Sequence, residues 1–582
     1  MENLYTNESD ILELVALMKA HGILRAVVSP GSTNISLAAS LLYDKDIKVY
    51  SAVDERSAAY MACGLAEETR EPVAISCTGA TAARNYVPAL TEAFYRKLPI
   101  LCLTSSQYFG RVGQHMPQVT DRTNPMNDIV VKSVQIPIAH SAEDKWSNNV
   151  KMNDAMLELK RNGGGPVHIN IETAFSRIFD QKALPNVRKI DRFFLKDELP
   201  EIIARKIIIF VGSHSRFDNE LTELIDEFCE RYNAVVICDH TSNYKGAHRI
   251  LGGLVERQQG YQPNCRDCEL LIHIGEVSGA YYPFPNVPVW RVNPDGEIRD
   301  TFHGLTCVFQ MEEKDFFKEI LSKDSSSSKV PEITYYEQWT NEEKKLYDAL
   351  PDLPFSNAWI AQQTAKKLPA NSEIHFGILN SLRMWNLFEI PDSVYGYCNV
   401  GGFGIDGCIS SLIGASLADK KKLFFGVFGD LATFYDLNSL GNRHIGNNLR
   451  ILVVNNGTGF EMRHKDNRGD IFNNDADILF AAAGHFGNKS RVVLKHFSED
   501  LGFEYLSAED KNNYLEKLAY FTDTNMHERP MLFEVFIDEQ AENESYDLTQ
   551  YIIRDMSNTA KRKVKSILGE KNVQKLKGIL KH

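Results

Sequence analysis

The stretch Phe424–Gly459, FFGVFGDLATFYDLNSLGNRHIGNNLRILVVNNGTG, contains two apolar runs that each end in small and polar residues. The runs predict two buried parallel strands, the first ending at Gly429–Asp430 and the second at Asn455–Asn456. Open parallel sheets bind ligands at the carboxyl ends of their strands. A carboxylate and an amide oxygen at this edge suit a hard divalent cation, which prefers oxygen ligands. Either half alone could be a helix cap or a turn, but together they predict a metal site.

Similar alternation of apolar runs with helically spaced segments extends over most of the 582 residues. Alternating strands and helices are typical of parallel sheets that carry helices on both faces. We therefore predict an α/β protein with three doubly wound parallel-sheet domains and a basic C-terminal tail. The expected domains span residues 1–185, 195–322 and 335–555, the tail spans 556–582, and the serine-rich run Lys323–Lys329 is expected to link the second and third domains.

Composition and charge exclude several classes of protein. The chain is 43% hydrophobic and 24% charged, which is typical of a folded protein rather than a disordered one. Its net charge of −13 argues against nucleic acid as a partner, because phosphate binding needs a concentrated basic surface. No apolar run is long enough to span a bilayer, and the N-terminus is acidic where a secretory signal is positive. We expect a cytoplasmic protein.

Two local patterns have weaker meanings. Cys265 and Cys268 have zinc-ligand spacing, but no second Cys or His pair accompanies them, so reduced thiols are the better interpretation. The segment Lys561–His582 holds eight Lys or Arg and one acid. Apolar residues recur among its lysines at helical spacing: Val564, Ile567, Leu568, Leu576, Ile579 and Leu580. This pattern is typical of an amphipathic basic helix suited to peripheral contact with the inner membrane surface, and a solvated C-terminus is an equal alternative because Gly569 and Gly578 weaken a helix.

The segment Val53–Ala59, VDERSAA, is expected to end a strand and open a helix. An acid at a helix start is common because the helix dipole stabilises it, and on this segment alone that structural interpretation of Glu55 is preferred.

The pairing of Gly429–Asp430 with Asn455–Asn456 resembles the cofactor motif of the thiamine-diphosphate (ThDP)-dependent decarboxylase and carboligase superfamily. The resemblance implies ThDP and Mg²⁺ as cofactors, with Asp430, Asn456 and the backbone carbonyl of Thr458 as metal ligands. Glu55 is similar to the glutamate of this superfamily that hydrogen-bonds the aminopyrimidine ring of the cofactor. A carboxylate there favours the imino tautomer, which lets the cofactor act as its own base.

Further matches over residues 10–540 are most similar to the menaquinone-pathway synthases of this superfamily. They are Ser29–Ser32, Cys77–Asn85, Asn380–Leu382, Gly404–Gly407 and Asp436–Asn438. The resemblance implies that Glu55, Gln118 and Ser32 face the reaction, with Ile405 supporting the bent cofactor. It also implies a cofactor-binding set of Thr81, Asn85, Ser381, Phe403, Ile405, Gly429, Leu431 and Ala432. Active sites in this family lie between subunits, which implies a homodimer or homotetramer.

One departure from the family bears on the substrate. The synthases hold carboxylate-rich substrates with arginines and a lysine, and the matching positions here are uncharged: Thr33, Gln107, Ala280, Tyr281, Trp385 and Val400. Arginine is the residue that best fixes a carboxylate. This loss predicts a different substrate, although Arg84, Arg111 and Arg383 remain available for a single carboxylate or phosphate.

We therefore expect a ThDP- and Mg²⁺-dependent 2-oxo acid decarboxylase and carboligase with a small donor such as pyruvate. It would form a cofactor-bound enamine and protonate it or add it to an unknown acceptor carbonyl. The basic tail resembles tails on enzymes of bacterial surface-polysaccharide assembly, which suggests that context.

Three alternatives stand beside this interpretation. The first is a menaquinone-pathway synthase that uses 2-oxoglutarate and isochorismate, with arginines supplied from other positions. The second is a non-catalytic binding module with the ThDP fold. The third, a plain nucleotide-binding protein, lacks a Gly-x-Gly-x-x-Gly after a strand at the right place.

Overall fold

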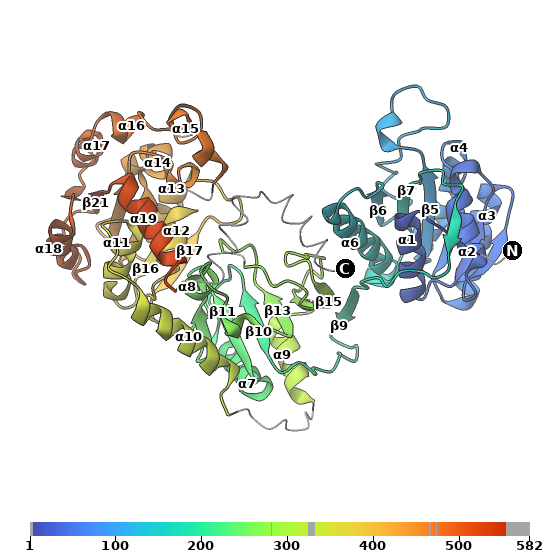
Figure 1. Ribbon diagram of the computed structural model, residues 1–582, viewed down its shortest axis with the longest axis horizontal. Coiled ribbons are helices and arrows are strands. Elements are labelled where there is room, and N and C mark those ends of the chain that lie inside the picture. Colours follow the sequence, from blue (N-terminus) through green and yellow to red (C-terminus); the bar gives the residue numbers. More distant parts are fainter. Residues whose placement is uncertain (1–3, 281, 324–331, 465–466, 473, 554–582) are drawn as a thin grey trace, which may run out of the picture. The chain divides into compact units, whose positions relative to one another are not determined.

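The computed structural model describes residues 4–280, 282–323, 332–464, 467–472 and 474–553. Tyr281, most of the serine-rich run and the basic tail lie outside the described residues. The described chain forms two compact units, residues 4–197 with 295–310 and residues 198–294 with 311–553 (Figure 1). We call them unit 1 and unit 2 and describe each by itself.

Unit 1 is built on a parallel sheet of order β3-β2-β4-β5-β7-β6. Its strands are β2 (Arg25–Val28), β3 (Lys48–Ser51), β4 (Val73–Cys77), β5 (Ile100–Ser106), β6 (Lys132–Ile136) and β7 (Val167–Glu172). Its main helices are α1 (Ser9–Ala20), α2 (Ile35–Tyr43), α3 (Glu55–Thr69), α4 (Thr81–Asn85), α5 (Val87–Arg96) and α6 (Ala142–Glu158). Two short pairs complete the unit, β1 (Tyr5–Thr6) with β8 (Phe179–Gln181) and β9 (Asp191–Phe194) with β15 (Leu305–Gln310).

Both faces of this sheet are buried, which explains the continuous apolar runs in its central strands. Leu101 and Leu103 of β5 pack in one core cluster with residues of α1, α2 and α6. Ile100 and Cys102 of the same strand pack in a second cluster with residues of α3 and α5. The helices therefore cover the sheet from both sides.

Unit 2 contains two parallel sheets. The first has the order β12-β11-β10-β13-β14, with β10 (Ile207–Val211), β11 (Ala234–Cys238), β12 (Arg249–Leu251), β13 (Leu270–Ile274) and β14 (Val289–Val292). Its helices are α7 (Asn219–Tyr232), α8 (Gly253–Glu256) and α9 (Glu313–Ser322), and α10 (Tyr335–Ala349) contacts β11 and α8.

The second sheet of unit 2 has the order β17-β16-β18-β19-β21-β20. Its strands are β16 (Glu373–Phe376), β17 (Tyr395–Cys398), β18 (Phe424–Gly429), β19 (Leu449–Asn455), β20 (Glu504–Ala508) and β21 (Met531–Phe536). The longer helices are α11 (Asn357–Thr364), α12 (Asn380–Trp385), α13 (Cys408–Ser416), α14 (Asp430–Tyr435), α17 (Val493–Asp500), α18 (Lys511–Phe521) and α19 (Glu539–Gln550), and α15 (Asp475–Leu479) and α16 (Phe486–Lys489) are short. The predicted α/β class with parallel sheets is confirmed, whereas the predicted domain limits stay predictions.

All three sheets contain a switch point, at which successive strands of the chain are added on opposite sides of one strand. In unit 1, β3 lies on one side of β2 and β4 lies on the other. In the same way, β10 lies between β11 and β13, and β16 lies between β17 and β18. Such switch points leave a crevice at the carboxyl ends of the two diverging strands. The crevices therefore lie beside β2 and β4, β10 and β13, and β16 and β18.

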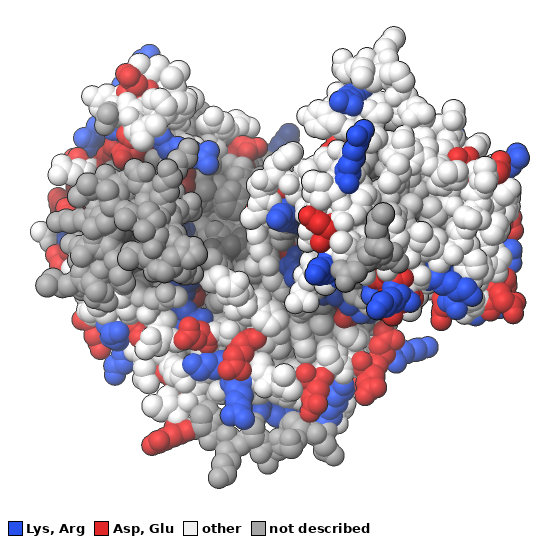
Figure 2. Space-filling model, turned by 45° about the vertical axis from the view of Figure 1, so that its right-hand side comes forward, with Lys and Arg blue, Asp and Glu red and all other residues white. Residues whose placement is uncertain are grey.

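The described residues show how charge is distributed on one face and whether any helix could cross a membrane. On the face shown in Figure 2, basic and acidic side chains are interspersed rather than gathered by sign. Within the described ranges, no helix combines the length and apolar character needed to cross a bilayer.

Candidate active site

The switch point of unit 1 is lined by the turns that follow β2 and β4. Ser32 begins a short 3₁₀ turn after β2 and is exposed, and Thr33 beside it is buried. The hydroxyl of Thr33 donates to the carbonyl of Ser105 over 3.1 Å and lies 2.5 Å from the hydroxyl of Thr78. A side chain at Gly31 would overlap Thr78, since a Cβ there would stand 2.3 Å from Thr78 Cβ. The two turns are therefore tightly joined.

Glu55 lies at the first position of α3, next to the helix cap formed by Asp54. Asp54 accepts a hydrogen bond from the Ser57 amide over 2.7 Å, so the cap leaves the half-buried carboxylate of Glu55 available for another partner. Asn85, at the end of α4, donates from Nδ2 to Oε2 of Glu55 over 3.0 Å. Unit 1 thus brings together two residues predicted to bind the cofactor.

Several backbone positions in the predicted site have positive φ angles although they are not glycine. In unit 1 they include Ala80 (φ 60°), just before Thr81 at the start of α4, and the exposed Gln118 (φ 63°). In unit 2 they include Leu379 (φ 66°) and Phe403 (φ 55°). Such conformations cost energy and are concentrated at functional sites.

Asp430 lies at the switch point of the second sheet of unit 2, directly after β18. Its side chain is only 6% exposed. Burial raises the pKa of this carboxyl to about 7, the charge of Glu534 adds to the rise, and backbone N–H groups of Leu431 and Asn456 oppose it. A cation beside this carboxyl would favour its ionised form.

Asn456 and Thr458 follow the neighbouring strand β19. The register pairs Gly429 with Val454, so the two strands end side by side. Asn456 Oδ1 accepts from the amide of Thr458 over 3.2 Å, and the carbonyl of Thr458 accepts from the amide of Phe460 over 3.0 Å while keeping a second lone pair. This oxygen donor set fits Mg²⁺. Among the described residues, no group of three or more His, Cys, Asp or Glu side chains offers another metal site.

The remaining predicted cofactor residues also lie around this sheet. Ser381 is buried in α12 after β16, and Ile405 is half-buried before α13. Phe403 is exposed, whereas Gly429, Leu431 and Ala432 join β18 to α14. Within unit 2 the structure therefore gathers Ser381 and the Gly429–Ala432 turn at the ends of the adjacent strands β16 and β18.

The positions that are uncharged here, where the menaquinone-pathway synthases carry arginines and a lysine, are mostly enclosed. Trp385 and Val400 are buried, like Thr33. Val400 and Leu382 both lie close to Gly279, since a Cβ there would stand 3.3 Å from Val400 and 2.3 Å from Leu382. Gln107 accepts from Arg111 over 2.7 Å, and Ala280 is half-buried.

The three arginines that could bind a carboxylate or phosphate differ in the partners that they already have. Arg383 forms a bidentate pair with Glu461, at 2.7 and 3.2 Å. This ion pair already satisfies its charge. Arg84 is exposed and donates to the carbonyl of Asp121 over 3.0 Å, and Arg111 is exposed beside Gln107. Arg122, which the sequence did not single out, is only 8% exposed and lies against Gly79; no local pattern in the sequence marks it.

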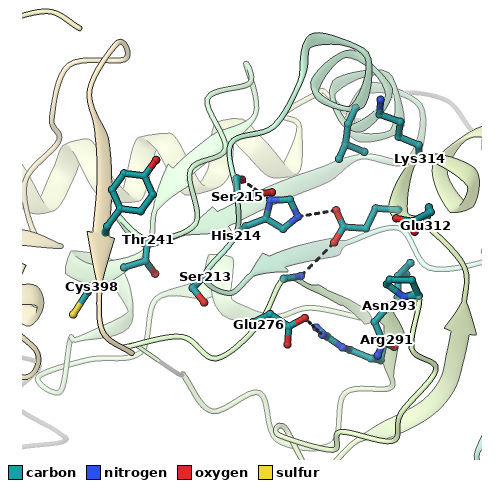
Figure 3. A pocket seen from close by; sticks show the side chains of 16 residues that line it. Ser213, His214, Ser215, Thr241, Glu276, Arg291, Asn293, Glu312, Lys314 and Cys398 are labelled. Carbon is teal, nitrogen blue, oxygen red and sulfur yellow. Dashed lines mark hydrogen bonds and ion pairs between the residues drawn. The ribbon is translucent and has the colours of Figure 1, made fainter. Parts of the chain in front are cut away.

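A separate cavity of about 740 Å³ lies at the switch point of the first sheet of unit 2 (Figure 3). His214 and the Gly275 amide contact the two oxygens of the Glu313 carboxylate, at 3.1 and 3.4 Å, and Glu276 lies 3.9 Å from Arg291. None of the predicted site residues lines this cavity.

Comparison with known proteins adds independent findings. Residues 13–125, which include Ser32, Glu55, Thr81, Asn85 and Gln118, match the family described as thiamine pyrophosphate enzyme, N-terminal TPP binding domain. The chain is 32% identical over 562 residues to 2-succinyl-5-enolpyruvyl-6-hydroxy-3-cyclohexene-1-carboxylate synthase of Bacteroides fragilis, covering 92% of this chain and 97% of the relative. Synthases of the same name from Bacteroides thetaiotaomicron and Flavobacterium johnsoniae are 31% and 26% identical, over 92% and 90% of this chain and 96% and 95% of theirs.

Proposed function

Because the chain belongs to the thiamine-diphosphate enzyme family that includes these synthases, we propose that it decarboxylates a 2-oxo acid and joins the remaining acyl unit to an acceptor. The observation that carries this proposal is similarity over nearly the whole length of the relatives, together with the paired strand ends at Asp430 and Asn456. ThDP, when bound, supplies the electron sink that lets carbon dioxide leave. This chemistry makes the chain an enzyme of the lyase or transferase type.

In the proposed site, Asp430, Asn456 and the carbonyl of Thr458 bind Mg²⁺. Support comes from the burial of Asp430, whose raised pKa indicates that its charge lacks a counter-ion. A divalent cation would supply that counter-ion and connect the protein to the diphosphate. Ser381, Ile405, Phe403, Gly429, Leu431 and Ala432 would contact the cofactor around these ligands.

Glu55 is proposed to accept a hydrogen bond from the aminopyrimidine ring of ThDP. The contact from Asn85 supports this role because it fixes the carboxylate without neutralising its charge. Thr81 and Asn85 would border the same ring, and Ser32 and Gln118 would face the substrate from the turns of unit 1.

The family resemblance implies active sites between subunits, so we propose a homodimer or homotetramer. Large apolar side chains are exposed beside both sets of predicted residues. In unit 1, Val53 is 84% exposed, two residues before Glu55. In unit 2, Leu479 is 72% exposed near Ala481, whose carbonyl accepts from the Thr458 hydroxyl over 3.0 Å. Exposed apolar groups of this kind are typical of surfaces that another protein covers.

The comparisons favour the relatives' substrates over a simple small donor. The relatives' name describes a product with a succinyl group, an enolpyruvyl group and a ring carboxylate. Under this proposal the donor is 2-oxoglutarate, whose second carboxylate remains in the succinyl group, and the acceptor is isochorismate. This substrate pair corresponds to the first alternative from the sequence, and the similarity supports it better than the initial expectation of pyruvate.

A second candidate keeps the same chemistry with a mono-carboxylate donor such as pyruvate. The observation in its favour is the burial of Thr33, Trp385 and Val400 without charge, since an unpaired carboxylate is costly to bury.

Direct competition between 2-oxoglutarate and pyruvate separates the two candidates. The purified chain is incubated with ThDP, Mg²⁺, both acids and isochorismate, and the products are identified by mass spectrometry. Preferential consumption of 2-oxoglutarate with a condensation product supports the synthase. Preferential consumption of pyruvate establishes the second candidate, and release of no carbon dioxide from either would leave a non-catalytic module.

A further inference from the structure

Arg122 is a buried cation whose guanidinium is left largely without partners. Its side chain is 8% exposed, and within the described part of the chain Nε and Nη1 have no hydrogen-bond partner. The third nitrogen, Nη2, is not among these enclosed atoms. Of the three nitrogens, Nη2 is therefore the one that a ligand can reach.

None of the described groups near Arg122 supplies the missing negative charge. The electrostatic neighbours of Arg122 are the thiols of Cys77 and Cys102 and the guanidinium of Arg84. Burial raises the pKa of Cys77 to about 12 and that of Cys102 well above its usual value, so both thiols stay neutral. Burial also lowers the pKa of His168 to about 3, which leaves that imidazole neutral. Among the described residues, the charge of Arg122 is thus uncompensated.

The position of the guanidinium links it to the candidate active site. A Cβ built on Gly79 would stand 2.7 Å from Nη1 and 3.2 Å from Nη2, so Arg122 lies directly against the turn after β4. That turn leads into α4, whose Asn85 contacts Glu55. The backbone of Arg122 is held in place by Gln135, which donates to its carbonyl over 3.3 Å.

A buried arginine that a fold keeps unpaired is expensive unless an anion neutralises it in the working state. Planar carboxylates match the guanidinium best and form charge-assisted hydrogen bonds with it. We infer that Arg122 binds a substrate carboxylate that is retained through the reaction, and that it determines specificity for acidic substrates. This inference rests on the proposed function. The carboxylate could belong to the donor or to the acceptor.

The first test does not require turnover. Thermal unfolding of the full chain with ThDP and Mg²⁺ is measured against increasing succinate, an unreactive dicarboxylate, for the wild type, Arg122→Gln and Arg122→Lys. Succinate should raise the Tm of the wild type by mass action, and the apparent Kd should weaken about 30-fold or more in Arg122→Gln, the loss typical of removing one partner of a buried charged pair. Arg122→Lys should retain part of the effect, and the exposed Arg96→Gln serves as the matched control.

The second test separates donor from acceptor. KM is measured for 2-oxoglutarate and for isochorismate in the same variants, and the substrate whose KM rises in Arg122→Gln carries the bound carboxylate. ThDP affinity should stay unchanged, and the Tm without succinate should be equal or higher, because an uncompensated charge has been removed.

The outcomes separate this inference from the proposed function. Equal succinate affinity in the wild type and Arg122→Gln, or an absent response in both, would overturn the inference whether or not the enzyme turns over. Loss of ThDP affinity and Tm in Arg122→Gln without a change in KM would show a structural role and overturn it too. A wild type that binds ThDP and succinate but consumes no 2-oxo acid would refute the proposed function alone.

Discussion

Asn85 donates a hydrogen bond from Nδ2 to Oε2 of Glu55 across 3.0 Å, although the two residues lie at opposite ends of different helices, α4 and α3. α3 begins shortly after β3, and α4 follows the turn after β4. The hydrogen bond uses Oε2 of Glu55, and Oε1 takes no part in it. Glu55 is therefore oriented by the protein with one oxygen left for another partner.

Glu55→Gln should separate cofactor binding from catalysis. The amide keeps the shape of the side chain but lacks the charge that supports the imino tautomer, so ThDP should remain bound while turnover falls about 10²–10⁴-fold. Calorimetry with ThDP and Mg²⁺ and a carbon dioxide release assay measure the two effects. Asp54→Ala is the control: it removes the cap of α3 and should cost about 1 kcal/mol of stability with little effect on turnover per folded molecule. Normal turnover in Glu55→Gln would reduce Glu55 to a helix-start acid.

Asp430→Ala should abolish Mg²⁺-dependent binding of ThDP. The variant removes the buried carboxylate that we propose as a ligand, and neither Asn456 nor a backbone carbonyl can replace its charge. Titration calorimetry of ThDP with and without Mg²⁺ checks this, with the exposed Asp419→Asn as the control. Undiminished, Mg²⁺-dependent affinity in Asp430→Ala would contradict the metal assignment.

Glu461→Gln should change the acid sensitivity of unfolding. Burial raises the pKa of Glu461, but hydrogen bonds from His464 and Arg383 outweigh it and lower the pKa from 4.5 to about 2. A carboxyl with a depressed folded-state pKa contributes stability above its unfolded pKa, and this contribution is lost as the pH falls from about 4.5 through about 2. At neutral pH the free energy of unfolding of the wild type should exceed that of the variant by up to about 3 kcal/mol. This difference should shrink as the pH falls from about 4.5 through about 2. Urea unfolding at several pH values measures it, and an unchanged difference at pH 2 would refute the prediction; the exposed Glu516→Gln is the control.

Gly79→Ala should impair the binding of acidic substrates without touching any charged residue. The added methyl group would stand 2.7 Å from Arg122 Nη1, so the guanidinium must move. We expect the KM of the affected substrate to rise in the same direction as in Arg122→Gln, with ThDP affinity retained. Gly64→Ala is the control, because a Cβ there meets no atom within 4 Å. A KM equal to that of the wild type would show that the contact with Gly79 is unimportant for binding.

The sequence predicted the sheets better than it predicted the partners of individual side chains. The apolar runs that became β18 and β19 are local features, and the polar residues at their ends follow from the same alternation. The pairing of Arg383 with Glu461 joins positions 78 residues apart, and no local pattern reveals that this arginine is already neutralised.

Arg122 could not be identified for a related reason. Its isolation depends on burial against Gly79 and on the neutrality of Cys77 and Cys102, and each of these properties arises only when β4, β5 and the intervening loops are packed together. In the sequence Arg122 is one basic residue in a polar loop. The proposed roles of the other site residues stay predictions until the variants are measured.

The close approach of Arg122 to Gly79 also constrains how this chain and its descendants can diverge. A side chain acquired at position 79 would overlap the present place of the guanidinium at position 122, so the arginine would have to shift or be replaced. A gain of bulk at the turn should therefore be accompanied by a displaced or replaced arginine at position 122.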